Sequence, residues 1–283
     1  MTPLPTLSLL APAKLNLFLH ITGKRADGYH NLQTVFQLLD YGDTMHFFAN
    51  DSGMVTVNMP GLAIAPEQNL IVRAAKLLPH GHRGVHIDVD KRLPDGGGLG
   101  GGSSDAATTL LALNQLWQCG KTEDELAELG RMLGADVPVF VRGHSAWAEG
   151  IGEQLTPLEL PKRWFIVIKP DCHVNTGEIF SHSRLTRDSS AITIAAFFKG
   201  AHRNDCQPLV RELYPEVDKA LKWLGKFAEA SLTGTGACVF AECQDQPFAA
   251  AVLKQLPKRW NGFIAQGVNI SPTVQTLTAR QMI

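Results

Sequence analysis

The sequence predicts an α+β fold divided into two domains, and three observations lead to this prediction. The chain has 283 residues, enough for two ordinary hydrophobic cores. Apolar residues make up 45% of it and charged residues 19%, which is typical of a globular protein. Segments with strand and helix periodicity follow one another without a steady βαβ rhythm. Because Pro157 and Pro161 enclose a polar stretch, we expect domains over residues 1–158 and 159–283.

The first half begins with extended segments. Residues 13–20 alternate between apolar and polar side chains, so that Lys14 and Asn16 share one face of a strand. A turn is expected at Asp27, and a second extended run ends at Asp40. Residues 1–10 contain two prolines and no basic segment, which indicates an irregular start rather than a signal peptide. In chain order, the other elements expected here are strands at 45–48, 54–59 and 85–89 and helices at 69–78, 106–117 and 123–133.

The second half is also expected to mix strands and helices, and it contains no internal repeat. In chain order, the expected elements are a strand at 164–168, a helix at 177–183, helices within 208–228, a strand at 237–241, a helix at 249–256 and a strand at 263–268.

The most unusual stretch is a run in which six of the seven residues from 96 to 102 are glycine. Glycine loses the most backbone freedom on folding, so such a run indicates positive φ values or a close approach to a ligand. A strand is expected before it and a helix after it, with Ser103 or Ser104 as the N-cap and Gly120 beyond the end. Free N–H groups and the positive end of a helix dipole would meet there, which predicts a site for nucleotide phosphates.

Three other interpretations of this run are possible. A P-loop needs a lysine directly after the last glycine, and none occurs before Lys121. Gly96, Gly98 and Gly101 match the dinucleotide-binding fingerprint, but its acidic residue would fall in a later helix rather than at a strand end. A flexible linker is disfavoured by the strand and helix expected on either side. We therefore favour the phosphate site.

Phosphoryl transfer also needs a cation near the transferred group and a carboxylate near the acceptor hydroxyl. Asp136 is the most isolated acidic residue of the first half, and Lys14 is a charge in an otherwise apolar run. Taken singly, such an aspartate more often caps a helix, and such a lysine more often extends to solvent. Together with the glycine run, the two residues predict a kinase.

Two further segments could contact a ligand. Gly234 and Gly236 precede an apolar strand, where they form either a plain hairpin turn or a close backbone approach to a ligand. Tyr29 and His30 follow a turn, where an aromatic ring either packs in the core or stacks on a base.

Charge and cysteine content exclude several classes of function. The chain has 26 basic and 27 acidic residues and a net charge of -1, so it has no general field for nucleic acid or an anionic membrane. Five cysteines without C-x-x-C spacing predict a reduced, cytoplasmic chain with no structural zinc site. Any recognition of phosphate must therefore be local.

Five segments resemble the GHMP small-molecule kinases: 12–17, 25–30, 93–107, 134–138 and 232–238. The resemblance implies an N-terminal α/β domain with a topology also found in a ribosomal protein, and a C-terminal ferredoxin-like α+β domain. It implies ATP-dependent phosphorylation of an alcohol. The first two segments are similar to those members that phosphorylate the 2-hydroxyl of a cytidine-diphosphate-linked methylerythritol in non-mevalonate isoprenoid biosynthesis. The alternatives are a sister kinase for homoserine, mevalonate or a sugar, an RNA-binding module, and a catalytically silent nucleotide sensor.

The resemblance also implies roles for individual residues. Asp136 would be the catalytic base, and Lys14 would pair with it and stabilise charge near the acceptor oxygen. The substrate would be held by Asn16, Tyr29, His30, Thr176, Phe180, Gly234 and Thr235, with the rings of Tyr29 and Phe180 on either side of cytosine. ATP would be held by Asn69, Lys91, Gly96, Gly97, Gly98, Leu99, Gly100, Gly101, Gly102, Ser103 and Ser104.

The resemblance implies ATP as its magnesium complex. Gly101 and Gly102 stand where many family members have a magnesium-binding serine, so we assign no protein ligand to the metal. The expected partner is a small molecule carrying a cytidine diphosphate, with neither nucleic acid nor a membrane. We expect a monomer or a weak homodimer.

Overall fold

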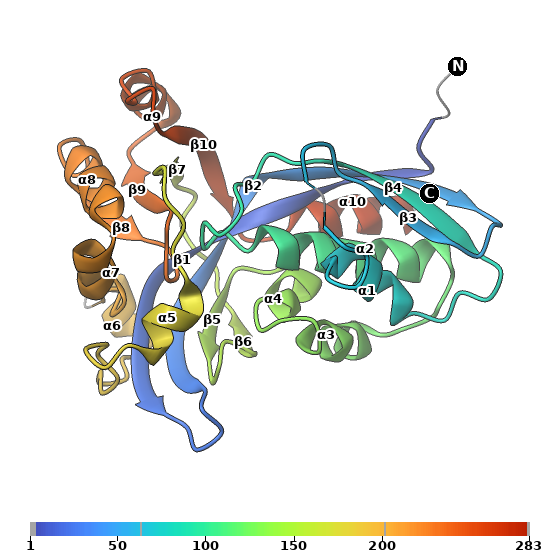
Figure 1. The fold of residues 1–283 in the computed structure, drawn as a ribbon, viewed down its shortest axis with the longest axis horizontal. Helices are drawn as coiled ribbons and strands as arrows, with labels where there is room; N and C mark the ends of the chain where they lie inside the picture. Colours follow the sequence, from blue (N-terminus) through green and yellow to red (C-terminus); the bar gives the residue numbers. More distant parts are fainter. Residues whose placement is uncertain (1–3, 63, 201, 282–283) are drawn as a thin grey trace.

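Two long antiparallel strands run through the whole molecule (Figure 1). The computed structural model describes residues 4–62, 64–200 and 202–281. Strand β1 (Leu7–Lys24) pairs with β2 (His30–Asn50), from Leu7 opposite Phe47 to Lys24 opposite His30. Each strand therefore contributes to both lobes of the molecule.

The β1–β2 pair differs from the sequence prediction in two respects. The run expected to end at Asp40 and the strand expected at 45–48 are one continuous strand. A Cβ on Gly42 would collide with the Ala11 backbone, so only glycine fits where β2 passes β1 here. Residues 7–10, expected to be irregular, open β1 because they pair with β2, and residues 1–3 lie outside the described ranges.

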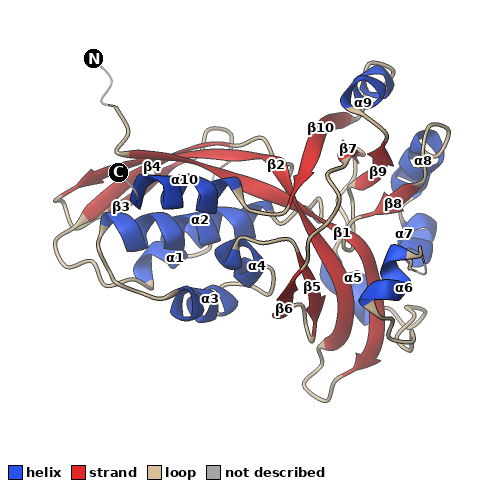
Figure 2. Cartoon of the chain, turned by 180° about the vertical axis from the view of Figure 1, so that it is seen from behind, coloured by secondary structure: helices blue, strands red, loops and turns tan. Residues whose placement is uncertain are grey.

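The first lobe is a sheet covered on one face by helices (Figure 2). Strand β4 pairs with β2 on one side and with β3 on the other, while β5 pairs with β2 and β6. The bounds of these strands are β3 (Val55–Asn58), β4 (Gly84–Asp90), β5 (Ala146–Glu149) and β6 (Gln154–Pro157). The helices are α1 (Leu70–Lys76), α2 (Gly101–Leu116), α3 (Glu123–Arg131) and α4 (Val137–Arg142).

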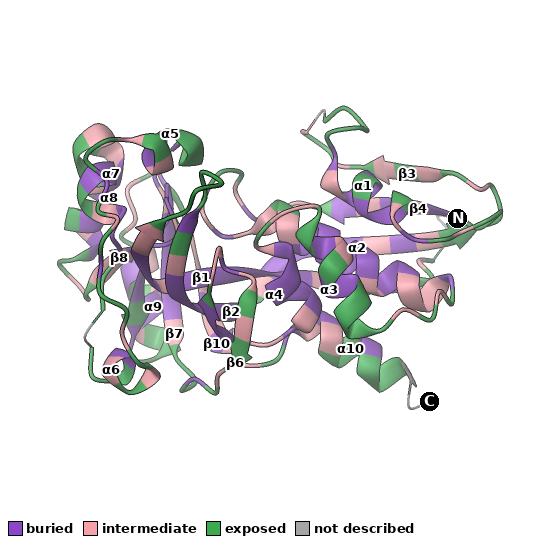
Figure 3. Ribbon diagram, turned by 90° about the horizontal axis from the view of Figure 1, so that it is seen from below, coloured by how far each residue is buried: buried purple, intermediate pink, exposed green. Residues whose placement is uncertain are grey.

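Helix α2 is the central helix of this lobe, and Figure 3 shows how much of it is buried. Leu110, Leu113 and Trp117 pack in the same core as side chains of β1, β2 and β4. The buried core helix expected at 106–117 is therefore confirmed. The burial fixes α2 against the sheet, so its N-terminus has a defined place at the end of the glycine run.

The caps of α2 differ from those predicted. Its N-cap is Gly100 at a φ of 74°, and Ser103 and Ser104 lie within the helix. The helix starts earlier because glycine reaches this left-handed conformation, which serine rarely adopts. At the other end Gln118, with a φ of 50°, takes the position expected for Gly120. By contrast, the capping box that begins at Thr122 and opens α3 is confirmed.

The second lobe is an antiparallel sheet in the order β10-β7-β9-β8, with helices packed on it. Its strands are β7 (Trp164–Lys169), β8 (Ala230–Leu232), β9 (Val239–Cys243) and β10 (Asn261–Val268). Its helices are α5 (Thr176–Ser181), α6 (Ile194–Phe198), α7 (Gln207–Leu213), α8 (Pro215–Leu224) and α9 (Gln246–Leu253). Strand β10 also pairs with β2, at Gly267 opposite Leu39, so one sheet joins both lobes.

The last helix, α10 (Pro272–Gln281), returns to the first lobe. Leu277 lies in the core of that lobe, and the Thr273 hydroxyl donates to the Leu10 carbonyl at 2.6 Å. The division at residue 158 stays a prediction, and this helix packs across it. Sequence periodicity missed α10, and it missed α6, β5, β6 and β8 because elements of three to five residues are too short to show a period.

A third core lies where the two lobes meet. Leu93 and Leu99 from either side of the first glycines pack there with Leu15 of β1 and Phe165 of β7. The glycine run is therefore supported by side chains from both lobes. Within the described ranges, every helix is too short or too polar to cross a membrane.

Candidate active site

The glycine run, residues 96–102, forms a loop that continues into the first residues of α2, and this glycine loop packs against a second loop, 233–236, between β8 and β9. Gly98 has a φ of 75°, and a Cβ there would collide with the Thr233 carbonyl and lie 3.2 Å from the Gly236 carbonyl. The segment after β8 is thus both a hairpin connection and a contact surface for the first loop. This close approach accounts for part of the glycine content.

The glycine loop borders two cavities. The smaller, of about 230 Å³, is lined by Leu70 and residues 94–103. The larger, of about 680 Å³, is lined by residues from both lobes. Gly98 and Ser103 line both cavities, so the loop stands between them. A phosphate chain held by the loop N–H groups could therefore extend from the smaller cavity towards the larger.

Lys14 and Asp136 meet at the larger cavity. The Lys14 Nζ atom lies 3.3 Å from Asp136 Oδ2, with side chains that are 3% and 36% exposed. Lys14 is fixed on β1, where its N–H donates to the Leu99 carbonyl at 3.0 Å. Asp136 occupies the N-cap position of α4, but its side chain makes no capping hydrogen bond. The carboxylate instead faces a buried ammonium on one side and the cavity on the other.

Asn16 and Thr233 connect this ion pair to the glycine loop. Asn16 Oδ1 accepts a hydrogen bond from Lys14 Nζ at 2.6 Å, and the Asn16 N–H donates to Thr233 Oγ1 at 3.0 Å. The Thr233 hydroxyl donates in turn to the Gly98 carbonyl at 3.3 Å. Sequence reasoning missed Thr233. The signal that could have found it is a hydroxyl residue directly before the Gly-x-Gly segment.

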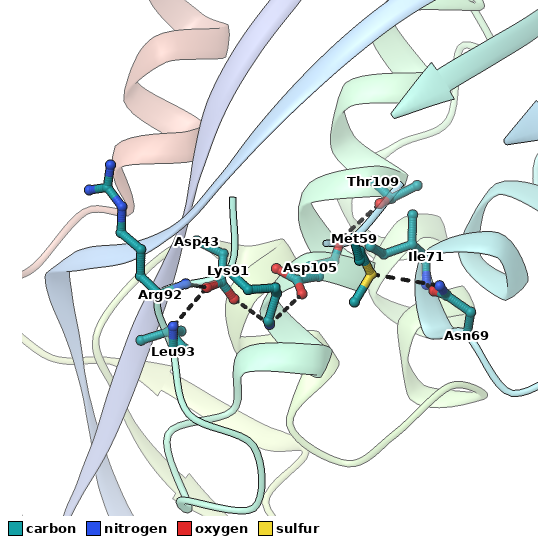
Figure 4. Close-up of polar contacts among 9 residues, drawn as sticks. All are labelled: Asp43, Met59, Asn69, Ile71, Lys91, Arg92, Leu93, Asp105 and Thr109. Atoms are coloured by element: carbon teal, nitrogen blue, oxygen red, sulfur yellow. Dashed lines mark hydrogen bonds and ion pairs between the residues drawn. The ribbon is translucent and has the colours of Figure 1, made fainter. Parts of the chain in front are cut away.

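Figure 4 shows Lys91 between two buried carboxylates. Its Nζ atom lies 2.5 Å from Asp43 Oδ2 and 3.0 Å from Asp105 Oδ2. Asp43 Oδ1 also accepts the N–H groups of Arg92 at 2.6 Å and Leu93 at 2.8 Å. This cluster, missed from the sequence, ties β2 to the segment before the glycine loop and to α2 after it. Burial raises the pKa of Asp105 to about 7, against the opposing effect of the Lys91 ammonium.

Three of the residues predicted to bind ATP lie beside the two cavities rather than in their linings. The Asn69 side chain caps α1, accepting the Ile71 N–H at 2.9 Å. Lys91 is held by its two carboxylates, and the buried Ser104 hydroxyl has no hydrogen-bond partner among the described residues. Nucleotide-binding roles for Asn69, Lys91 and Ser104 stay predictions.

The aromatic residues lie in the same larger cavity. The rings of His30 and Phe180 stack with centroids 5.4 Å apart and planes 29° apart, and Tyr29 is 60% exposed. The hydroxyls of Thr176 and Thr235 lie 2.8 Å apart. The structure brings all seven predicted substrate residues together with Lys14 and Asp136 around this one cavity.

One arginine beside the aromatic residues was also missed. The Arg187 Nε–H donates to His30 Nε2 at 3.0 Å. Burial lowers the pKa of His30, and the charges of Arg187 and Lys24 lower it further. Nothing in the local sequence indicates this contact, because 157 residues separate the two partners.

Comparison with known families and folds agrees with this geometry. Residues 69–144 match the GHMP kinases N terminal domain, and residues 188–262 match the GHMP kinases C terminal domain. A crystal structure of 4-(cytidine 5'-diphospho)-2C-methyl-D-erythritol kinase superposes with a TM-score of 0.81 at 32% identity, covering 93% of this chain and all of that one. A mevalonate kinase structure, at a TM-score of 0.68 and 17% identity, shares the fold.

Curated relatives match over nearly the full length. The 4-diphosphocytidyl-2-C-methyl-D-erythritol kinase of Tolumonas auensis is 56% identical over 266 residues, or 93% of each chain. That of Pseudomonas aeruginosa is 56% identical over 268 residues, or 94% of this chain and 95% of the relative. The expected α+β class and the GHMP kinase architecture are confirmed. This chain belongs to the GHMP kinases, in the family of 4-diphosphocytidyl-2-C-methyl-D-erythritol kinases.

Proposed function

We propose that this enzyme transfers the γ-phosphoryl group of ATP to the 2-hydroxyl of 4-diphosphocytidyl-2-C-methyl-D-erythritol. One observation carries the proposal: a buried ammonium and a cavity-facing carboxylate, Lys14 and Asp136, lie 3.3 Å apart beside the glycine loop. The loop offers N–H groups at the N-terminus of α2, a 16-residue helix whose dipole favours negative charge. A phosphate donor and an alcohol acceptor can therefore meet at one point.

In the proposed reaction, the acceptor oxygen forms a bond to the γ-phosphorus while the bond to the β–γ bridging oxygen breaks, and ADP leaves. The acceptor proton passes to a carboxylate oxygen of Asp136, which acts as general base. Lys14 stabilises the negative charge that develops near the acceptor oxygen. Asn16 holds the Lys14 ammonium in place through the 2.6 Å hydrogen bond to its Oδ1.

We assign the aromatic part of the larger cavity to the cytosine ring. Tyr29 is an exposed ring that packs little against the protein, which suits stacking on a base. Phe180 and His30 come from distant parts of the sequence and line the same cavity, so a base placed there would contact both halves of the chain. Thr176, Gly234 and Thr235 line the path towards the catalytic pair.

ATP is expected to arrive as its magnesium complex, in which the ion offsets phosphate charge. Over residues 4–62, 64–200 and 202–281, no three His, Cys, Asp or Glu side chains are grouped to hold a metal, and we assign no protein ligand to it. All five cysteines are free thiols, so we place the enzyme in the reducing cytoplasm. We further propose two domains divided near residue 158 and a monomer or weak homodimer.

The proposal is tested by coupling ATP consumption to phosphorylation of candidate acceptors. We expect turnover with the cytidine-linked methylerythritol and none with mevalonate, homoserine, galactose or methylerythritol phosphate lacking the cytidine. Turnover of any acceptor without the cytidine, at a comparable kcat/KM, would contradict the assignment of the aromatic residues to the base.

A further inference from the structure

Arg187 connects helix α5 to the start of strand β2 at the part of the larger cavity that we assign to the base. Its guanidinium donates to the Phe180 carbonyl at 2.8 Å and the His182 carbonyl at 2.7 Å, at the C-terminal end of α5, and to the Leu185 carbonyl at 3.1 Å. Its Nε atom also donates a hydrogen bond of 3.0 Å to His30 Nε2. The Arg187 side chain thus binds the backbone of Phe180 and the ring of His30, and these two residues stack on each other.

The contact with His30 determines where that ring carries its proton. An arginine guanidinium stays protonated and has only donors, so the Nε2 atom it faces must be an acceptor. A neutral imidazole with Nε2 as the acceptor carries its hydrogen on Nδ1. Among the described residues Nδ1 has no protein partner, and His30 lines the cavity. His30 therefore has a donor, and no ring acceptor, left for a ligand.

We propose that Arg187 is a positioning residue that holds His30 as the Nδ1–H tautomer and thereby selects cytosine over uracil. The inference rests on the proposed function and deepens it. Cytosine has a lone pair at ring atom N3, whereas uracil carries a hydrogen there. The His30 Nδ1–H group can donate a hydrogen bond to N3 of cytosine. Against uracil it would face the N3–H group, and both desolvated donors would stay unpaired.

The charges around the His30 ring also favour its neutral form. Among the described residues, the charged groups that act on the His30 ring are Arg187 and Lys24, and both are cations that disfavour the imidazolium. Burial disfavours it too. The neutral ring with a fixed tautomer is therefore the state presented to the base at neutral pH. Without Arg187 a neutral His30 can carry its hydrogen on either nitrogen, and one of the two tautomers would accept the N3 hydrogen of uracil.

The first test measures the protonation of His30 in the wild-type protein, and a variant serves only to assign its signals. Nitrogen-15 NMR of the histidine rings, with His30 assigned from the signals lost in His30→Gln, should show Nδ1 protonated and Nε2 unprotonated at pH 8. Protonation on Nε2 would overturn the proposal whatever the activity of the enzyme.

The second test compares kcat/KM for the cytidine substrate and its uridine analogue in wild type, Arg187→Met and Arg184→Met. Arg184 is a matched control because it is an exposed arginine in the same segment, paired with Glu212. We expect Arg187→Met to lower the cytidine-to-uridine ratio about 10-fold to 100-fold at pH 8, and Arg184→Met to leave it unchanged. An unchanged ratio in a folded Arg187→Met protein would overturn the proposal.

The pH dependence separates this role from a merely structural one. In Arg187→Met the ratio should recover only at a pH below the ordinary histidine pKa of about 6.5, because burial and Lys24 still lower the pKa of His30. An imidazolium donates from both nitrogens, so the ring then presents a donor to the base again. A ratio that is lowered equally at every pH would contradict the tautomer mechanism. If the proposed function itself were wrong, the wild-type enzyme would not phosphorylate the cytidine substrate at all. That outcome can be told apart from an unchanged cytidine-to-uridine ratio.

Discussion

The Lys14 ammonium lies 3.3 Å from the Asp136 carboxylate, and this contact joins strand β1 to the N-terminus of helix α4 beside the glycine loop. The lysine is buried and the aspartate is reachable from the cavity, so the pair has one fixed member and one that can meet a substrate. The acceptor hydroxyl would therefore approach from the Asp136 side.

Replacing Asp136 with asparagine should lower kcat by about 10²-fold to 10⁴-fold, as expected for loss of a general base. ATP affinity, measured by calorimetry, should be kept, because the loop N–H groups are untouched. Asp88→Asn is a matched control, since Asp88 is similarly exposed and lies on β4 beside His86. Near-normal turnover in Asp136→Asn would remove Asp136 from its proposed role.

Replacing Tyr29 with alanine should weaken binding of the cytidine substrate by about 1–3 kcal/mol, the usual contribution of an aromatic ring stacked on a base. The melting temperature should not change, because the ring is 60% exposed. Phe198→Ala, in which a ring 52% exposed is removed from α6, controls for loss of surface aromatic area. If the substrate KM does not change in Tyr29→Ala, the ring does not contact the base.

Thr233→Val and Thr233→Ser separate the hydroxyl of Thr233 from its volume. Valine keeps the shape but leaves the buried Asn16 N–H without its acceptor and Gly98 without its donor, at a cost of about 1–3 kcal/mol. We expect Thr233→Val to raise the KM for ATP and lower the free energy of unfolding. Thr233→Ser should keep a KM for ATP near that of wild type. Equal KM values for the two variants would contradict a role for the hydroxyl in positioning the loop.

The Asp43–Lys91–Asp105 cluster predicts a pH-dependent stability. Because burial raises the pKa of Asp105 to about 7, its carboxyl keeps a proton in the folded chain that the unfolded chain has already lost above pH 4. The folded state therefore loses stability as pH rises from about 4 to about 7, with no further loss from this group above that range. An asparagine side chain at this position cannot titrate, and Lys91 keeps Asp43 as a partner.

Asp105→Asn should thus gain stability relative to wild type as pH rises through this window. The gain should reach a few kcal/mol at most, since one pKa unit corresponds to about 1.4 kcal/mol. Urea unfolding of both proteins at pH 4.5, 6 and 8 measures the difference. A constant difference across the three pH values would mean that Asp105 does not titrate in this range.

Local sequence determined much of this protein. Apolar periodicity located the buried helix α2 and strands β3, β4 and β7, and the T-x-x-E pattern located the start of α3. The glycine run and the segments around Lys14 and Asp136 were sufficient to indicate a kinase of the GHMP family. These features depend on residues close together in the chain, which is why one sequence reveals them.

Only the tertiary structure decided which distant groups meet. The Asn16 N–H binds a hydroxyl 217 residues away, Arg187 binds a ring 157 residues away, and Lys91 binds Asp43 across 48 residues. Strand pairing and lobe packing bring these partners together, and neither leaves a periodic signal in the sequence. The cap of α2 was missed for a related reason: the left-handed conformation of Gly100 lets the helix begin before either serine, beside the Lys14 side chain.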